Sequence, residues 1–209
     1  LNKIGFDQLN KNEKYHPTKL DFYSINYNKI CDLDLTIFNS VNEKYTTLKR
    51  SILIKFLKEK LLTNSIMFGK KINDVEQKNG KINIHFIDGT RDKVDYLVVS
   101  DGVFSSSKSV IEKKIFKPNY HGAIAVRTQI TTKDAVNLNS NNISLIMGSN
   151  AHLVLYPINK LKEINLVCII RKKLEDNDSI KTILEKTILK ENKNLVNLFK
   201  GDLKSWSIY

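Results

Sequence analysis

Four short segments in the second half of the chain constrain its fold most strongly. Each is rich in β-branched residues, and polar residues separate it from the next: AIAVRTQI (123–130), ISLIMG (143–148), HLVLYPI (152–158) and INLVCIIRKK (164–173). Such side chains pack well on a pleated surface, and polar turns at this spacing allow successive strands to reverse direction. The pattern predicts an antiparallel sheet.

The first 45 residues predict the end of a helix and then a hairpin. LNKIGFDQLN (1–10) has helical character interrupted by Gly5. KLDFYSINYNKICDLDL (19–35) alternates apolar and polar residues, with a turn expected at Asn26–Asn28. The first residue is Leu1 rather than methionine, and we expect the chain to be a fragment of a longer protein.

A helix is predicted from Thr47 through TLKRSILIKFLKEKLL. Its apolar residues recur at three- and four-residue spacing, which places them on one face of a helix. Thr46 or Thr47 can cap this helix, because a threonine oxygen accepts a hydrogen bond from a free amide of the first turn.

Three short strand candidates follow this helix: SIMFG (65–69), KINDVEQ (71–77) and KINIHFIDG (81–89). Asn79-Gly80 separates the last two and tolerates the positive φ of a tight hairpin, and Asp88-Gly89 closes the next arm. The uninterrupted apolar run Tyr96–Val99 then indicates a strand covered on both faces.

The last part of the chain predicts a helix and a strand. Residues 179–199 carry an amphipathic pattern through Ile180, Ile183, Leu184, Ile188 and Leu189, and the chain ends with the strand-like SWSIY (205–209). Together with the strand patterns, these helices indicate a mixed α/β (α+β) fold.

The composition leaves two classes of partner open. The 209 residues carry a formal net charge of +12, which would suit nucleic acid or an anionic membrane surface. The lysines are scattered along the chain rather than gathered in an arginine-rich block, which favours a solvated surface. A noncatalytic basic module that binds nucleic acid is kept as the alternative function.

The two cysteines, Cys31 and Cys168, form no CxxC unit and indicate neither a zinc site nor a redox pair. They are compatible with a reducing cytoplasm or with one disulfide. No segment reaches the roughly 18 consecutive apolar residues of a membrane span. His16, His85 and His121 have no carboxylate or cysteine at metal-ligand spacing, so no metal site is expected.

An acid and a glycine, Asp101 and Gly102, directly follow the apolar run. Ligands bind open α/β sheets beyond the carboxyl ends of the strands, where loops are exposed. Gly102 would let a ligand approach the backbone, and Asp101 could accept hydrogen bonds from a ribose. Taken alone, Asp-Gly after a strand is also a common turn.

The spacing of Ser100-Asp101-Gly102, Ser105 and Lys108 resembles the ADGxxSxxR box of FAD-dependent aromatic-ring monooxygenases with the para-hydroxybenzoate hydroxylase fold. In that family the aspartate and glycine lie beside the ribose and pyrophosphate of the flavin. Ser100 replaces the alanine of the box and Lys108 its arginine, and lysine lacks the planar fork of donors that makes two parallel hydrogen bonds.

Other segments resemble the same family in the same order. LKRSILIKFL places Arg50 at the arginine that reaches the flavin, and YHGAIAVRT matches a family segment at Tyr120, Gly122, Ala125 and Arg127. HLVLYPINKLKEINLVCI resembles a strand pair of salicylate-hydroxylase-like members, and Trp206 with Tyr209 resembles a later strand. The G-x-G-x-x-G fingerprint and the GDAAH-type segment are not in this sequence.

The resemblance implies FAD as the cofactor, held by Arg50, Asp101, Gly102 and Ser105. NAD(P)H would reduce the flavin as co-substrate, and O2 would supply one oxygen atom to a phenol, quinol or salicylate-like ring. A small aromatic acid and a prenylated phenol of the ubiquinone pathway both remain open as substrates. We expect a cytoplasmic protein, which could also associate peripherally with the inner face of the membrane.

The resemblance also implies a domain plan. Residues 1–45 would be a helix end and a hairpin of the substrate layer, and residues 46–113 part of a Rossmann-like FAD-binding domain. Residues 114–176 would form an inserted antiparallel substrate sheet, and residues 177–209 would return toward the FAD domain.

His152 is the candidate catalytic residue. It heads a strand on which Val154 and Tyr156 share its face. An imidazole with its ordinary pKa near roughly 6.5 can take a proton from a phenol at neutral pH. The alternative is a histidine that serves only the sheet. Tyr156-Pro157 is expected to shape the end of this strand, because proline cannot donate to a central ladder.

Overall fold

The computed structural model describes residues 1–39, 44–62, 65–117, 119–135, 138–160, 163–172 and 207–208. The chain divides into two compact units, one made of Leu1–Lys60 with Gly122–Tyr209 and the other of Leu61–His121. We describe each unit by itself.

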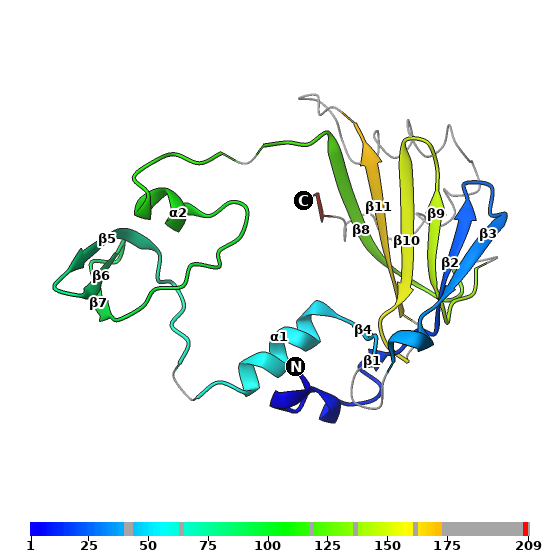
Figure 1. Cartoon of the computed structure of the whole chain (residues 1–209), viewed down its shortest axis with the longest axis horizontal. Coiled ribbons are helices and arrows are strands. Elements are labelled where there is room, and N and C mark those ends of the chain that lie inside the picture. Colours follow the sequence, from blue (N-terminus) through cyan, green and yellow to red (C-terminus); the bar gives the residue numbers. More distant parts are fainter. Residues whose placement is uncertain are drawn as a thin grey trace. The chain divides into compact units, whose positions relative to one another are not determined.

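A seven-stranded sheet forms most of the first unit (Figure 1). Its order is β12 (Ser207–Ile208), β8 (Ala123–Thr131), β11 (Glu163–Arg171), β10 (Ala151–Pro157), β9 (Ile143–Met147), β2 (Lys19–Ser24) and β3 (Lys29–Asp34). All pairs are antiparallel except β2 with β9, which run parallel. The four predicted strands of the second half and the early hairpin are therefore confirmed.

One face of this sheet carries the hydrophobic core. Buried and less buried residues alternate along β8 and β10, as expected when one face is covered. The core cluster draws on five strands of the sheet and the turn after β8: Tyr23, Ile124, Val126, Ile130, Ala135, Ile146, Ala151, Leu153, Leu155, Ile164, Leu166, Cys168 and Ile170.

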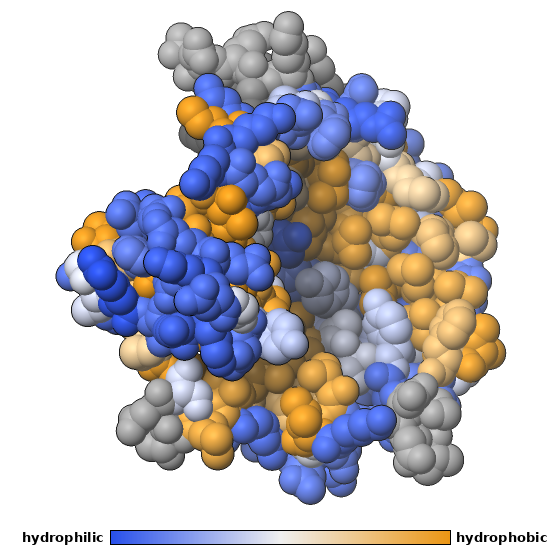
Figure 2. All heavy atoms as spheres, turned by 60° about the vertical axis from the view of Figure 1, so that its left-hand side comes forward, coloured by the Kyte–Doolittle hydropathy of each residue, from blue (hydrophilic) through white to orange (hydrophobic). Residues whose placement is uncertain are grey.

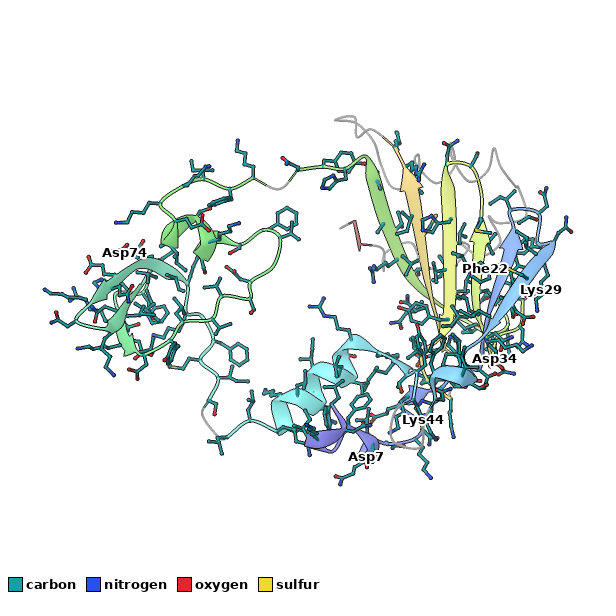
Figure 3. All side chains as sticks on the ribbon, in the orientation of Figure 1. Asp7, Phe22, Lys29, Asp34, Lys44 and Asp74 are labelled. Atoms are coloured by element: carbon teal, nitrogen blue, oxygen red, sulfur yellow. The ribbon has the colours of Figure 1, made fainter. Side chains whose placement is uncertain are left out.

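The β2–β3 hairpin is held to the sheet by a buried charge. Asp21 is 1% exposed, accepts a hydrogen bond of 2.7 Å from the Asn142 amide, and lies 2.8 Å from the ammonium of Lys29. Lys29 also lies 2.7 Å from Asp32, which is three residues further along the same strand, β3. Figure 3 labels Lys29 and Phe22 on this hairpin. The turn between the strands has Tyr27 at a φ of 64°.

The first unit also contains helix α1 (Arg50–Glu59) and several short elements. Two 3-10 turns, η1 (Asn2–Ile4) and η2 (Phe6–Gln8), flank Gly5, whose φ of 83° is the left-handed conformation that glycine favours. Strands β1 (Lys14–Tyr15) and β4 (Thr47–Leu48) pair with each other, and η3 (Thr36–Phe38) follows β3.

The predicted threonine cap of α1 is wrong. The helix begins at Arg50 after Lys49, and no side chain caps it. Thr47 is instead part of β4, and its hydroxyl donates to the carbonyl oxygen of Pro157. The Thr47 side chain therefore makes a tertiary contact and not the helix cap that the local sequence predicts.

The second unit contains a three-stranded antiparallel sheet and one short helix (Figure 1). The strands are β5 (Ile72–Lys78), β6 (Lys81–Phe86) and β7 (Arg91–Val94), and the helix is α2 (Ser106–Ile111). Asn79 and Gly80 both have positive φ, 52° and 71°, which confirms the predicted tight turn. Asp88-Gly89 forms the next turn as predicted, although the sequence pattern missed β7.

The buried strand predicted at Tyr96–Val99 is wrong for this structure. The segment has no strand pairing, and Tyr96 and Val98 are 88% and 85% exposed. A strand covered on both faces needs neighbours on each side. Within the described part of this unit, Ile84 is the one buried apolar side chain. SIMFG is likewise not a strand.

Exposed apolar side chains are numerous, and Figure 2 shows both hydrophobic and hydrophilic patches on one face. Among the described residues, no helix is both long and apolar enough to cross a membrane. The predicted helix at residues 179–199 lies outside the described residues. Of the strand predicted at 205–209, the structure describes β12.

Candidate functional site

The predicted flavin box forms one compact network in the second unit. The Ser105 hydroxyl donates to Asp101 Oδ1 at 2.5 Å, and the Ser107 amide donates to Asp101 Oδ2 at 3.2 Å. Ser105 is the N-cap residue of α2, and its oxygen accepts a hydrogen bond from the Lys108 amide at 3.0 Å. Ser105 therefore has a local structural role, because its hydroxyl oxygen accepts a hydrogen bond from an amide of the first helical turn that has no partner within the helix.

The same network sets the electrostatics of Asp101. The hydrogen bond from Ser105 lowers the pKa of the Asp101 carboxyl below its ordinary value, so this group is ionised at neutral pH. Each carboxylate oxygen can accept more than one hydrogen bond. Asp101 is exposed and can therefore still bind a hydroxyl group of a ligand.

Gly102 leaves the backbone beside Asp101 open. Its φ is 83°, and a Cβ atom built on it would meet nothing within 4 Å. Together with Val99, Asp101, Ser105, Lys108, Ile111 and Glu112, it lines a pocket of about 280 Å³. Lys108 places its ammonium 4.2 Å from the centre of the Phe116 ring. The pocket therefore combines an exposed carboxylate, open backbone and one cation.

Arg50 lies in the first unit, at the first residue of α1, where its side chain is exposed. Two contacts fix this end of the helix to the sheet. The Thr47 hydroxyl reaches the Pro157 carbonyl, and the Lys49 ammonium lies 2.7 Å from Glu163 Oε1. The sequence did not reveal these contacts, because the partners are more than a hundred residues apart.

The Lys49–Glu163 pair predicts a pH dependence of stability. The ammonium of Lys49 and then the Asn159 amide lower the pKa of Glu163 below its ordinary value. A carboxyl with a lowered pKa stabilises the fold above its unfolded pKa, about 4.3, and that stabilisation disappears as pH falls through the folded pKa. For this partly exposed pair we expect Lys49→Met to cost about 0.5–1 kcal/mol at neutral pH.

Thermal melts of the two proteins across pH would test this. The gap in melting temperature between wild type and Lys49→Met should close below about pH 4. Lys55→Met is the matched control, since Lys55 lies 4.0 Å from Glu59 on the exposed face of α1. A gap for Lys49→Met that stays constant down to acidic pH would contradict the role of Glu163.

His152 is exposed on the less covered face of the large sheet. Its ladder neighbours are Met147 on β9 and Ile169 on β11. Val154 and Tyr156 follow on the same face, as predicted. Pro157 is the last residue of β10, which confirms that it ends the strand.

Tyr156 is a residue of this face whose environment the sequence did not reveal. Burial raises its pKa, and the guanidinium of Arg127 on β8 opposes that shift. Tyr156 directly precedes Pro157, whose carbonyl accepts the hydrogen bond from the Thr47 hydroxyl. His152 lies five residues before Pro157, about 16 Å away along the strand at roughly 3.3 Å per residue. Tyr156 is therefore the polar residue of β10 closest to the start of α1.

Three of the five predicted site residues, Asp101, Gly102 and Ser105, lie together in the second unit. Arg50 and His152 belong to the first unit, at different ends of the sheet. The described residues contain no group of three metal-ligating side chains.

Comparisons with known proteins place this geometry in context. No family model matches the chain. The FAD-dependent monooxygenase eupB of Phoma sp is 23% identical over 225 residues, which cover 97% of this chain and 46% of eupB. The salicylate hydroxylase asL1 of Sarocladium schorii is 26% identical over 188 residues, which cover 77% of this chain and 38% of asL1.

A solved structure agrees with these relatives. HpxO of Klebsiella pneumoniae, complexed with FAD and uric acid, superposes with a TM-score of 0.80 at 12% identity over 95% of this chain and 52% of that protein. The chain is thus similar in sequence to FAD-dependent monooxygenases and salicylate hydroxylases, and it shares the fold of a flavoprotein. It spans about half the length of the curated relatives that it matches.

None of these proteins is named as binding nucleic acid, so the alternative function has no support from the comparisons. The residues around Asp101 and Gly102 suit one part of FAD. The Asp101 carboxylate can accept from ribose hydroxyl groups, and the open backbone at Gly102 permits close approach. A pocket of about 280 Å³ is too small for the whole cofactor, so these residues fit its ribose and phosphate region alone.

Proposed function

We propose that this chain is part of an FAD-dependent monooxygenase that hydroxylates an aromatic ring with NAD(P)H and O2. The observation that carries the proposal is the alignment of 97% of the chain with an FAD-dependent monooxygenase. The overall reaction would convert the substrate, O2, NAD(P)H and a proton into the hydroxylated substrate, water and NAD(P)+. One oxygen atom enters the ring and the other leaves as water.

The cofactor-binding residues in this proposal are Arg50, Asp101, Gly102 and Ser105. Asp101 would orient a ribose, Ser105 would hold the Asp101 carboxylate in place through their hydrogen bond, and Arg50 would supply a cation. When bound, the flavin supplies the electron transfer and the oxygen chemistry. The chain's own part is to bind, to orient the substrate and to exclude water.

The less covered face of the large sheet is the proposed substrate side. Pairing across β2, β9 and β10 places Phe22, Leu145 and Val154 on one face, together with His152 and Tyr156. Apolar side chains with a few polar groups suit a small aromatic molecule. His152 would accept the phenolic proton, and Arg127 on β8, which β11 separates from β10, would favour an anionic substrate.

This face supports a salicylate-like acid more than a prenylated phenol, because it presents a guanidinium near Tyr156. The HLVLYPI segment, which resembles salicylate-hydroxylase-like members, supports the same choice. A prenylated phenol of the ubiquinone pathway is the second candidate, and the net charge of +12 would assist its enzyme at an anionic membrane surface.

We also infer a reducing, cytoplasmic setting. Cys31 is exposed and Cys168 is buried, and no disulfide joins them, which supports a compartment where disulfides are rare.

The visible spectrum of the purified full-length protein tests the proposed function. We expect flavin absorbance that stays with the protein through gel filtration and that bleaches on anaerobic addition of NADH or NADPH. Salicylate should accelerate this bleaching, and hydroxylated product should appear in air. Protein without flavin, even after incubation with FAD, would refute the proposal.

A further inference from the structure

A second pocket lies in the first unit, and none of its lining residues has been assigned to flavin or substrate binding. It has a volume of about 990 Å³ and is formed where η1, η2, β1 and β4 meet helix α1. It is lined by Leu1, Asn2, Lys3, Phe6, Asp7, Lys11, Lys14, His16, Lys44, Thr46, Leu48, Leu53 and Lys160. We call it the lysine pocket. Figure 3 labels Asp7 and Lys44, which both line it.

Lys14 is built into the wall of this pocket. It is 7% exposed, and its ammonium donates to the carbonyl oxygens of Phe6 at 3.3 Å and Asp7 at 2.7 Å. Pairing of Lys14 with Leu48 fixes the backbone from which the side chain extends. The position of this buried cation is therefore set by the fold, unlike that of a mobile surface lysine.

Two further contacts hold the other walls in place. His16 Nδ1 lies 3.2 Å from the carbonyl oxygen of Tyr45 and 3.0 Å from Thr46 Oγ1, which ties the segment after β1 to the segment before β4. The Lys160 amide donates to the Asn12 carbonyl at 3.3 Å. Lys11, Lys44 and Lys160 therefore come from three separate segments that are cross-connected.

The charge in the pocket is unbalanced. Among the described residues that line it are five lysines and a single carboxylate, that of Asp7. Burial lowers the pKa of Lys14, Asp7 opposes this, and the neighbouring Lys11 and Lys44 lower it further. Burial also lowers the pKa of His16, and among the charges that add to this effect are Lys44, Lys14 and Lys160. Cations that disfavour one another's charge would be stabilised by an anion between them.

We propose that the lysine pocket binds a small organic anion that carries a phosphate or pyrophosphate group. The lysines would surround the phosphate oxygens, because several ammonium groups match a multiply charged anion. Phe6, Leu48 and Leu53 offer an apolar surface for the organic part of the ligand. A concave site of this volume suits a small molecule, whereas nucleic acid is bound by an extended basic groove.

The test is isothermal titration calorimetry of the full-length protein with inorganic pyrophosphate at constant ionic strength. We expect saturable binding in wild type and an affinity at least about tenfold lower in the double variant Lys11→Gln/Lys44→Gln. Both lysines are exposed, so the variant should keep the wild-type melting temperature. Lys133→Gln/Lys55→Gln, with the same loss of charge at exposed positions outside the pocket lining, should bind like wild type.

A second titration with ADP addresses the organic part of the ligand. ADP should bind more tightly than pyrophosphate, and Leu53→Ser should remove that advantage. The proposal is overturned if pyrophosphate produces no more heat than sodium chloride of equal ionic strength, or if both double variants weaken binding equally. It is also overturned if only nucleic acid binds, because that would identify an extended surface in place of a pocket.

Discussion

Replacing Asp101 with alanine is expected to weaken FAD binding by the full-length protein by about tenfold or more, since a charge-assisted hydrogen bond to a ribose hydroxyl would be lost. The carboxylate is ionised, exposed and held by Ser105 at 2.5 Å. Beside it, the backbone at Gly102 is open. The measurement is the dissociation constant of FAD, obtained by fluorescence titration of the apoprotein.

The control for this variant must also remove an exposed aspartate that stabilises a turn. Asp88→Ala is a matched control, because Asp88 is an exposed turn aspartate of the same unit. Like Asp101, it accepts a hydrogen bond from a nearby hydroxyl group, in this case that of Thr90 at 2.5 Å. Asp88→Ala should leave the affinity for FAD unchanged. Equal and small effects of the two substitutions would reduce Asp101 to a residue that only stabilises the start of α2.

The second large effect is expected on stability. Asp21→Ala removes a carboxylate that is 1% exposed and leaves the buried Asn142 amide without its acceptor at 2.7 Å. Loss of the partner of a buried donor, together with the ion pair to Lys29, should lower the free energy of unfolding by about 3 kcal/mol. Urea denaturation of the full-length protein gives this value.

Asp32→Ala provides the comparison for Asp21. Asp32 contacts the same Lys29, and that ammonium lowers the pKa of Asp32, but the side chain is solvent-accessible. Its removal should have a much smaller effect, because water screens exposed ion pairs and replaces their contacts. Similar losses for both variants would show that burial of Asp21 does not determine the strength of this network.

The two predictions differ in what the sequence alone revealed about each aspartate. Asp101 was identified from sequence because its chemistry lies within seven consecutive residues, from Asp101 to Ser107, which turn back on themselves. Asp21 was not identified. In the sequence it is one polar residue of an alternating strand, and only the position of Asn142, 121 residues away, explains its burial.

Local patterns determined the strands and turns of this protein. β8, β9, β10 and β11 follow from period-2 alternation of β-branched residues, and the β5–β6 turn follows from Asn79-Gly80, because these preferences depend on a few neighbouring residues. The site box at Asp101 and its link to flavoproteins also came from residue types at short spacing.

Tertiary structure decided which local preferences were realised. The Thr47 hydroxyl binds the Pro157 carbonyl instead of capping the helix, and β2 pairs with β9 in parallel. Tyr96–Val99 forms no strand, and its Tyr96 and Val98 are exposed. The lysine pocket likewise gathers lysines from positions 3 to 160, which in the sequence had indicated only a solvated surface. Side chains far apart in sequence interact through the packing of the folded backbone, and their distances are set by that packing alone.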